Sequence, residues 1–74
     1  MTNMNLRKEF AIRLKILMEE KNISCYKLGK ELGIAQQSIS RYLNCERTIT
    51  IDILIKIADY FNEDLNWLVG RYNY

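Results

Sequence analysis

Apolar residues recur every three or four positions along most of the chain, which is the spacing of one face of an α-helix. The first such stretch predicts a helix over residues 6–22, because Asn22 tolerates the left-handed conformation that ends many helices. Its apolar face consists of Leu6, Phe10, Leu14, Leu17 and Met18. Proline is absent and glycine occurs only three times, so the usual signals of strands and hairpins are missing. The pattern therefore predicts an all-α chain.

Residues 24–44 contain two short predicted helices joined by a tight turn. Ser24 can cap the first helix and Gly33 can end it, while the second covers residues 35–43. Gly29 lies one turn before the bend, where a small residue lets two steeply crossing helices approach each other. The shared core is expected to consist of Leu28, Leu32, Ile34, Ile39 and Tyr42. This arrangement is the helix-turn-helix pattern.

Two further helices are predicted after this unit. Thr50 can cap a fourth helix that ends at Asn62, and Asp64 can start a short fifth helix closed by Gly70. The side chains of the fourth helix expected to face the core are Ile51, Leu54, Ile55, Ala58 and Phe61. A chain of this length has room for one small core, so we predict a single domain over residues 1–74.

Six short segments carry a resemblance to a known family. They are Arg13-Leu14-Lys15, Leu28-Gly29-Lys30-Glu31-Leu32-Gly33-Ile34, Ser38-Ile39-Ser40-Arg41-Tyr42, Asn44, Leu54-Ile55-Lys56-Ile57-Ala58 and Leu65-Asn66-Trp67-Leu68-Val69-Gly70. Together they resemble the phage repressor and Cro family of small helix-turn-helix regulators, often called Xre-type. The resemblance implies a compact five-helix, lambda-repressor-like domain. It also implies that the third helix enters the DNA major groove, in a dimer that reads an inverted-repeat operator.

The third helix has a polar face opposite the side of Ile39, Tyr42 and Leu43, which we expect to face the core. Glutamine can hydrogen-bond bidentately to adenine and arginine to guanine, and this helix has no carboxylate to repel phosphate. An exposed helix face is polar in most proteins, but these side-chain types favour DNA. The predicted base-reading residues are Gln36, Gln37, Ser40 and Arg41.

The resemblance further implies phosphate contacts at the start of the second helix and in the loop after the third. The corresponding residues are Ser24, Cys25, Asn44, Arg47 and Thr48. Free backbone N–H groups at the start of a helix also suit phosphate. Arg7, Lys8, Lys27 and Lys30 can add to the positive field, although ordinary solvated side chains fit the sequence at least as well.

Several positions depart from the family pattern. Cys25 stands where relatives usually have a phosphate-clamping Gln, Ala35 where Ser or Thr caps the third helix, and Cys45 where Gly is frequent. Met18 and Leu43 stand where many relatives bury an Arg–Glu pair, and an apolar pair is often neutral or stabilising there. Cys25 carries a further hypothesis, that its oxidation adds bulk or charge at a phosphate contact.

Charge and rare residues narrow the function further. Residues 1–50 hold nine Lys and Arg against five Asp and Glu, a balance of +4, whereas residues 51–74 hold two against four, a balance of −2. With no histidine and only two cysteines, the sequence offers neither a metal site nor a nucleophile–base pair, so we predict no enzyme and no cofactor. Charges interrupt every apolar run before the roughly 20 residues of a membrane span. We therefore predict a cytoplasmic protein with no membrane partner.

The leading hypothesis is a sequence-specific double-stranded DNA-binding transcriptional regulator, a repressor that occupies its operator. The alternative is a protein-binding module with the same fold, such as an antirepressor. Protein-binding surfaces usually centre on aromatic or aliphatic anchors, which the polar face of the third helix lacks. A surplus of aromatic residues toward the C-terminus predicts a homodimer. The residues assigned to that interface are Tyr60, Trp67, Tyr72 and Tyr74.

Overall fold

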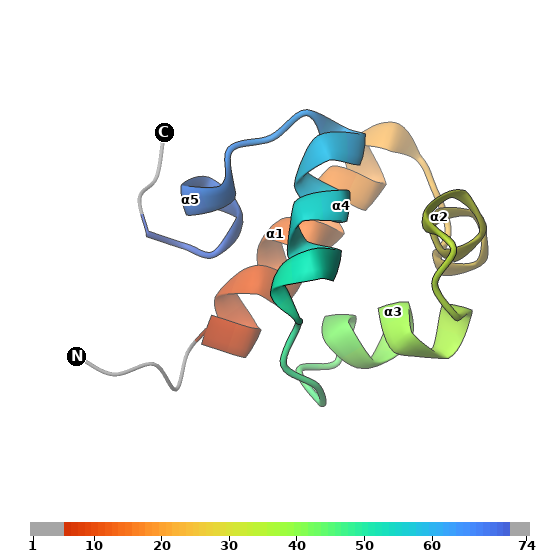
Figure 1. Cartoon of the computed structure of the whole chain (residues 1–74), viewed down its shortest axis with the longest axis horizontal. Coiled ribbons are helices and arrows are strands. Elements are labelled where there is room, and N and C mark those ends of the chain that lie inside the picture. Colours follow the sequence, from red (N-terminus) through yellow and green to blue (C-terminus); the bar gives the residue numbers. More distant parts are fainter. Residues whose placement is uncertain (1–5, 72–74) are drawn as a thin grey trace.

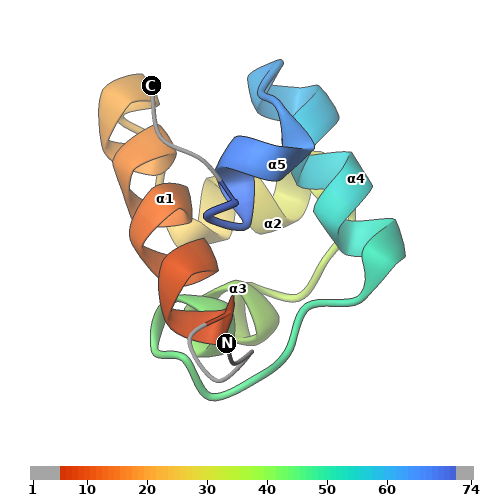
Figure 2. The ribbon, with the colours of Figure 1, turned by 90° about the vertical axis from the view of Figure 1, so that its left-hand side faces the viewer.

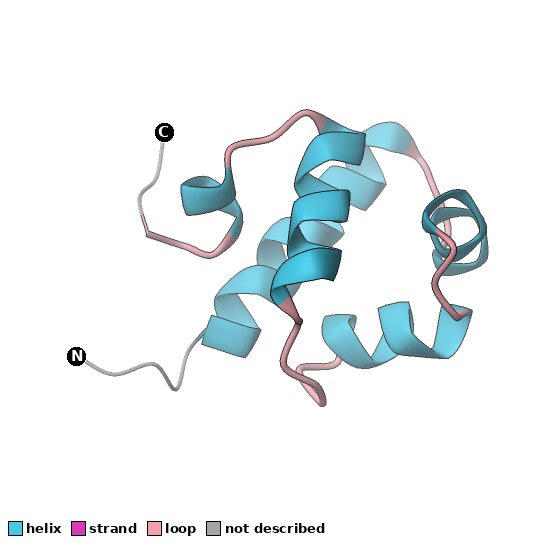
Figure 3. Cartoon of the chain, in the orientation of Figure 1, coloured by secondary structure: helices cyan, strands magenta, loops and turns pink. Residues whose placement is uncertain are grey.

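The computed structural model describes residues 6–71, and all regular secondary structure in that range is helical (Figure 3). The helices are α1 (Leu6–Lys21), α2 (Cys25–Leu32), α3 (Gln36–Leu43), α4 (Ile51–Phe61) and α5 (Leu65–Leu68). Figure 1 shows α5 and α2 toward opposite ends of the longest axis, with α3 along the lower edge. None of these helices is long and apolar enough to span a membrane. The predicted all-α, five-helix fold is confirmed.

Side-chain caps begin three of the helices, as the sequence predicts. Ser24 Oγ accepts a hydrogen bond from the backbone N–H of Lys27 at 3.1 Å, and Thr50 Oγ1 accepts one from Ile53 at 3.4 Å. Asp64 Oδ1 accepts from the backbone of α5, at 2.7 Å from Asn66 N. Such caps satisfy backbone donors that have no partner within the helix, and each contributes about 1 kcal/mol.

The core draws one completely buried side chain from every helix. These side chains, all 0% exposed, are Leu14 of α1, Leu28 of α2, Ile39 of α3, Ile57 of α4 and Leu68 of α5. Burying a side chain of this size stabilises the fold by about 1.5 to 3 kcal/mol. Figure 2 shows how the helices surround this centre, with α5 packed against both α1 and α4. No helix is therefore peripheral to the core.

The buried face of α4 differs from the predicted one. Ile51 and Ile55 are 68% and 43% exposed, whereas Ile57, which the sequence pattern did not single out, is completely buried. The buried stripe runs through Leu54, Ile57, Ala58 and Phe61. Asp52, Lys56 and Asp59 recur at helical spacing and mark the exposed side of this helix, so that Ile55 lies beside the charged side chains and Ile57 lies nearly opposite them.

A charged residue lies in the interface between α1 and α5. Arg13 is 8% exposed, forms an ion pair with Glu9 one turn earlier, and places its guanidinium carbon 5.5 Å from the centroid of the Trp67 ring. The backbone at Gly70 approaches Glu9 so closely that a Cβ there would lie 2.8 Å from the Glu9 Cβ. Stacking of a cation on an aromatic ring is stabilising, and more so when both groups are desolvated. This cluster connects the shortest helix to the longest.

Gly29 is the point of closest approach between α2 and the segment that leads into α3. A Cβ at this position would lie 2.5 Å from the carbonyl oxygen of Ile34 and 3.4 Å from the backbone nitrogen of Gln36. The Ile34 N–H donates to the Gly29 carbonyl at 2.8 Å across the same contact. The expectation that a small residue is needed here is confirmed, and any larger side chain must displace backbone.

We expect Gly29→Ala to lower the free energy of unfolding by about 2 kcal/mol. Overpacking against backbone costs about 1 to 3 kcal/mol, and the better helix propensity of alanine recovers only part of this. Urea denaturation followed by circular dichroism measures the change. Lys30→Ala, at the next and exposed position of the same helix, is the control and should leave stability nearly unchanged. A Gly29→Ala protein as stable as the wild type would contradict the close contact.

The loop after α3 contains a residue in an unfavourable backbone conformation. Cys45 has a φ of 63°, in the left-handed region, and its N–H donates to the Tyr42 carbonyl at 3.1 Å. Asn22 and Asn62 share this conformation at the ends of α1 and α4, but asparagine tolerates it better than other residues with a side chain. The glycine that is frequent at position 45 in the resembled family fits this geometry.

Cys45→Gly should therefore stabilise the protein, by about 1 kcal/mol, because glycine adopts a positive φ without the steric cost of a Cβ. Thermal unfolding of the two proteins under reducing conditions measures the difference. Cys25→Gly provides the opposite reference, since Cys25 is in the first turn of α2 and glycine should destabilise a helix. An unchanged or lowered stability of Cys45→Gly would contradict a strained backbone at position 45.

Candidate nucleic-acid interface

The outward face of α3 is polar along its whole length. Gln36, Gln37 and Arg41 are exposed and Ser40 is half-buried, whereas Ile39 and Tyr42 on the opposite face are 0% and 3% exposed. The ring of Tyr42 meets that of Phe10 of α1 edge to face, with centroids 6.2 Å apart. The buried side thus fixes the rotation of α3 about its own axis. Gln36, Gln37 and Arg41 consequently lie on the side of α3 away from the core, and Ser40 lies at the edge of that side.

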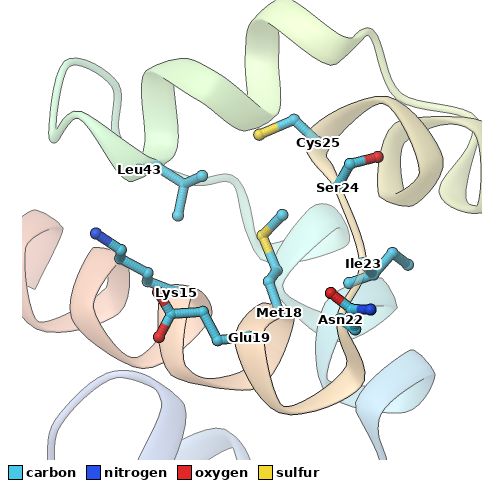
Figure 4. A pocket seen from close by; sticks show the side chains of 8 residues that line it. All are labelled: Lys15, Met18, Glu19, Asn22, Ile23, Ser24, Cys25 and Leu43. Atoms are coloured by element: carbon cyan, nitrogen blue, oxygen red, sulfur yellow. The ribbon is translucent and has the colours of Figure 1, made fainter.

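The start of α2 lies beside one flank of α3. Ser24 is exposed, and its hydroxyl already accepts the capping hydrogen bond from Lys27. Cys25, the first residue of α2, is half-buried and points toward α3, where Leu43 faces it (Figure 4). Of the two phosphate candidates on this flank, only Ser24 is well exposed. The backbone N–H groups at the start of α2 remain the more accessible anion-binding feature.

A pocket of about 290 Å³ separates the ends of α1 and α3 near Cys25. Met18 and Leu43, which stand where many members of the resembled family bury an Arg–Glu pair, both line it (Figure 4). Met18 is 6% exposed and Leu43 is half-buried. Apolar side chains therefore complete this side of the core without an ion pair. The Cys25 side chain also lines this pocket.

The loop between α3 and α4 lies along the other flank of α3 and is connected to two helices. Arg47 donates from Nη1 to Ser38 Oγ of α3 at 3.0 Å, and Arg7 of α1 donates from Nε to Thr48 Oγ1 at 2.7 Å. Asn44, Arg47 and Thr48 are all exposed. The phosphate candidates of this loop thus form a surface next to the polar face of α3, together with the exposed carboxylate of Glu46.

Arg7 is the residue of this surface that sequence reasoning did not single out. It lies 41 positions before Thr48, and the sequence shows it only as one of several cations that could equally be solvated. Neither helix periodicity nor the helix-turn-helix pattern connects the start of α1 with the loop after α3. Only the packing of α1 against α3 brings the two together.

Two of the aromatic residues assigned to a dimer interface already make contacts within the chain. Tyr60 is half-buried and meets Phe61 edge to face at 5.0 Å, while Lys21 lies 5.7 Å from its ring. Trp67 is half-buried beside Arg13. Tyr72 and Tyr74 lie outside the described residues. Exposed apolar side chains elsewhere include Ile12 and Ile16 on the outer side of α1, at 45% and 39%.

Comparison with known proteins places this geometry in a family. The helix-turn-helix family model matches residues 14–68. A protein of Pyrococcus furiosus named as an HTH-type transcriptional regulatory protein is 34% identical over 53 residues, which cover 72% of this chain and 17% of that relative. The solution structure of the SOS-response transcriptional repressor LexA from Eubacterium rectale superposes with a TM-score of 0.85 at 17% identity, over 100% of this chain and 81% of the other.

The structural likeness supports the five-helix fold, and the family model covers the α2–α3 unit together with most of the surrounding helices. The contact at Gly29, the bend at Gly33 and the polar outer face of α3 are the local features that this match includes. The chain belongs to the helix-turn-helix family.

Proposed function

We propose that this chain binds double-stranded DNA in a sequence-specific manner and represses transcription by occupying an operator. The main support for this function is that α3 has one face buried in the core and an opposite face that is polar and exposed. Ile39 and Tyr42 fix one side of the helix in the core, and Gln36, Gln37 and Arg41 are exposed on the other. The transcriptional regulator of Pyrococcus furiosus and the LexA repressor support the regulatory part of the proposal.

The side chains of α3 match the chemistry of the major groove. This groove is about 12 Å wide and admits an α-helix. A glutamine can pair with the N6 and N7 atoms of adenine, and an arginine with the O6 and N7 atoms of guanine. Ser40 can donate to or accept from either kind of base edge. The helix carries no carboxylate, so nothing on it opposes the approach to the phosphate backbone.

Phosphate contacts are available on both sides of α3. The start of α2 offers Ser24, Cys25 and free backbone N–H groups on one flank. The loop after α3 offers Asn44, Arg47 and Thr48 on the other. A helix in the major groove lies between two phosphate backbones. The start of α2 can therefore approach one backbone and the loop after α3 the other. Such contacts position the protein without reading sequence.

A homodimer on an inverted repeat completes the proposal. Two copies would place their α3 helices about 34 Å apart, one turn of DNA. Helix α5, which contains Trp67, lies at the opposite end of the longest axis of the molecule from α2 (Figure 1). Residues 51–74 also carry a charge of −2, which suits a surface turned away from phosphate.

In vitro selection from a random duplex library tests the proposal as a whole. At a stated salt concentration, we expect enrichment of a single motif composed of two inverted half-sites, spaced by about one helical turn. Enrichment of one half-site without a repeat would contradict the dimer and leave the reading of DNA by α3 intact. A library that remains random after repeated rounds would show that the chain does not recognise sequence.

Substitutions in α3 should change base specificity, whereas substitutions in the loop after α3 should lower affinity for all sequences. Gln37→Ala or Arg41→Ala should cost about 1 to 3 kcal/mol on the selected duplex and relax specificity at one base pair. Arg47→Ala should weaken binding to all duplexes about equally, because a phosphate contact carries no sequence information. Fluorescence anisotropy with the selected duplex and with single-base variants distinguishes the two patterns. Unchanged base preference in a Gln36, Gln37 and Arg41 triple alanine variant would refute the assigned reading face.

A further inference from the structure

Two arginines connect adjacent residues of the loop after α3 to different helices. Arg47 reaches Ser38 of α3 through Nη1, at 3.0 Å, and Thr48 accepts a hydrogen bond from Nε of Arg7 of α1, at 2.7 Å. Arg7, Arg47 and Thr48 are exposed, and Ser38 is half-buried. The loop is thereby fixed beside α3 by two charged groups, one of which comes from outside the helix-turn-helix unit.

These contacts place Arg47 along one edge of the polar face of α3, and Arg7 beside Thr48, the next residue of the loop. Ser38 and Arg41 are three residues apart in the helix and are therefore neighbours on its surface. The loop consequently borders the Arg41 side of that face. The opposite edge faces α2, because the backbone of Gln36 approaches Gly29 and Leu43 shares a pocket with Cys25.

The guanidinium of Arg7 is available to an anion. Its planar fork has further donors on the two Nη atoms besides the Nε that Thr48 engages. The nearest carboxylate along α1 is that of Glu9, and its ion pair is with Arg13 rather than with Arg7. A guanidinium oriented through one nitrogen presents the others in a set direction, which suits bidentate phosphate binding.

We propose that Arg7 is a phosphate-contacting residue of the DNA interface, and that Thr48 is its positioning residue. The inference rests on the function proposed above and extends the interface to the first turn of α1. It also changes the role of Thr48, because its hydroxyl oxygen accepts a hydrogen bond from Arg7 and so orients the Arg7 side chain. The α2 flank offers backbone N–H groups to one phosphate backbone, and the loop flank offers the guanidinium groups of Arg7 and Arg47 to the other.

Arg7→Ala tests the phosphate contact. The selected duplex and an unrelated duplex of equal length are titrated by fluorescence anisotropy over a range of salt concentrations. We expect both affinities to fall by the same factor, about tenfold at low salt. The slope of log K against log salt concentration should become less steep by about 0.9. A loss confined to the selected duplex would instead indicate base reading and would overturn the assignment.

Lys8→Ala is the matched control. It removes the same formal charge at the next position of α1, which is also exposed and points about 100° away around the helix. We expect it to lower the affinity less than about twofold and to leave the salt slope unchanged. Equal losses for Arg7→Ala and Lys8→Ala would show that only the general positive field acts, and the specific contact would be refuted.

Thr48→Val tests the positioning role, because it removes the hydroxyl and keeps the charge of Arg7. We expect it to weaken binding several-fold in the wild-type background and to have little effect in the Arg7→Ala background. Additive losses in this double-mutant cycle would mean that Thr48 acts independently of Arg7. Circular dichroism melts of all variants verify that these surface changes leave the fold intact.

The two proposals can fail separately. If the wild-type chain binds neither duplex at low salt, the DNA-binding function is refuted and the role of Arg7 with it. If the wild-type chain binds and Arg7→Ala binds equally well with an unchanged salt slope, only the role of Arg7 is refuted.

Discussion

The contact between α2 and the α3 entry at Gly29 is the constraint on which the rest of the structure depends. A Cβ there would lie 2.5 Å from the Ile34 carbonyl oxygen, so at this point the two segments meet backbone to backbone. Backbone contact fixes the crossing of α2 and α3 more rigidly than contact through flexible side chains can. Leu28 and Ile39 then lie on facing sides of the crossing and are completely buried. The polar face of α3 is directed outward as a result of this packing.

A small chain must bury a large share of its apolar surface to be stable, and this one does so by sharing one core among all its helices. Each helix contributes one completely buried side chain, so removing any helix would expose part of the common centre. The four-residue α5 has little stability of its own and depends on Leu68 and on the Arg13–Trp67 contact. The end farthest from α2 is therefore kept in place by side chains of α1.

Local chemistry made most of the fold predictable, because caps and glycines act over a few residues. Ser24, Thr50 and Asp64 begin helices where expected, and Gly33 adopts a left-handed conformation at the end of α2. Contacts between distant segments were not predictable. On α4 the expectation that Ile55 faces the core is wrong, although Asp52, Lys56 and Asp59 mark the exposed side of that helix. A charged residue such as Arg13 is usually exposed, and its burial here accompanies contacts with both Trp67 and Glu9.

In the candidate site, too, local features could be predicted from the sequence and contacts between distant segments could not. The polar side of α3 follows from helical periodicity, whereas the contact between Arg7 and Thr48 joins residues 41 positions apart and depends on how α1 meets the loop. Both ends of α3 also lack favourable local chemistry. Ala35 provides no side-chain cap at its start, and Cys45 follows its end in a left-handed conformation.

These two features cost α3 about 2 kcal/mol together relative to a capped helix followed by glycine. Burial of Ile39 and Tyr42, each of which contributes about 1.5 to 3 kcal/mol, offsets that cost. The position of the candidate reading helix is therefore set by its tertiary contacts, with α2 at Gly29 and with Phe10 of α1 at Tyr42, rather than by favourable chemistry at its own ends. A cavity created in α1 beneath Tyr42 would consequently disturb the outer face of α3 without altering any residue on it.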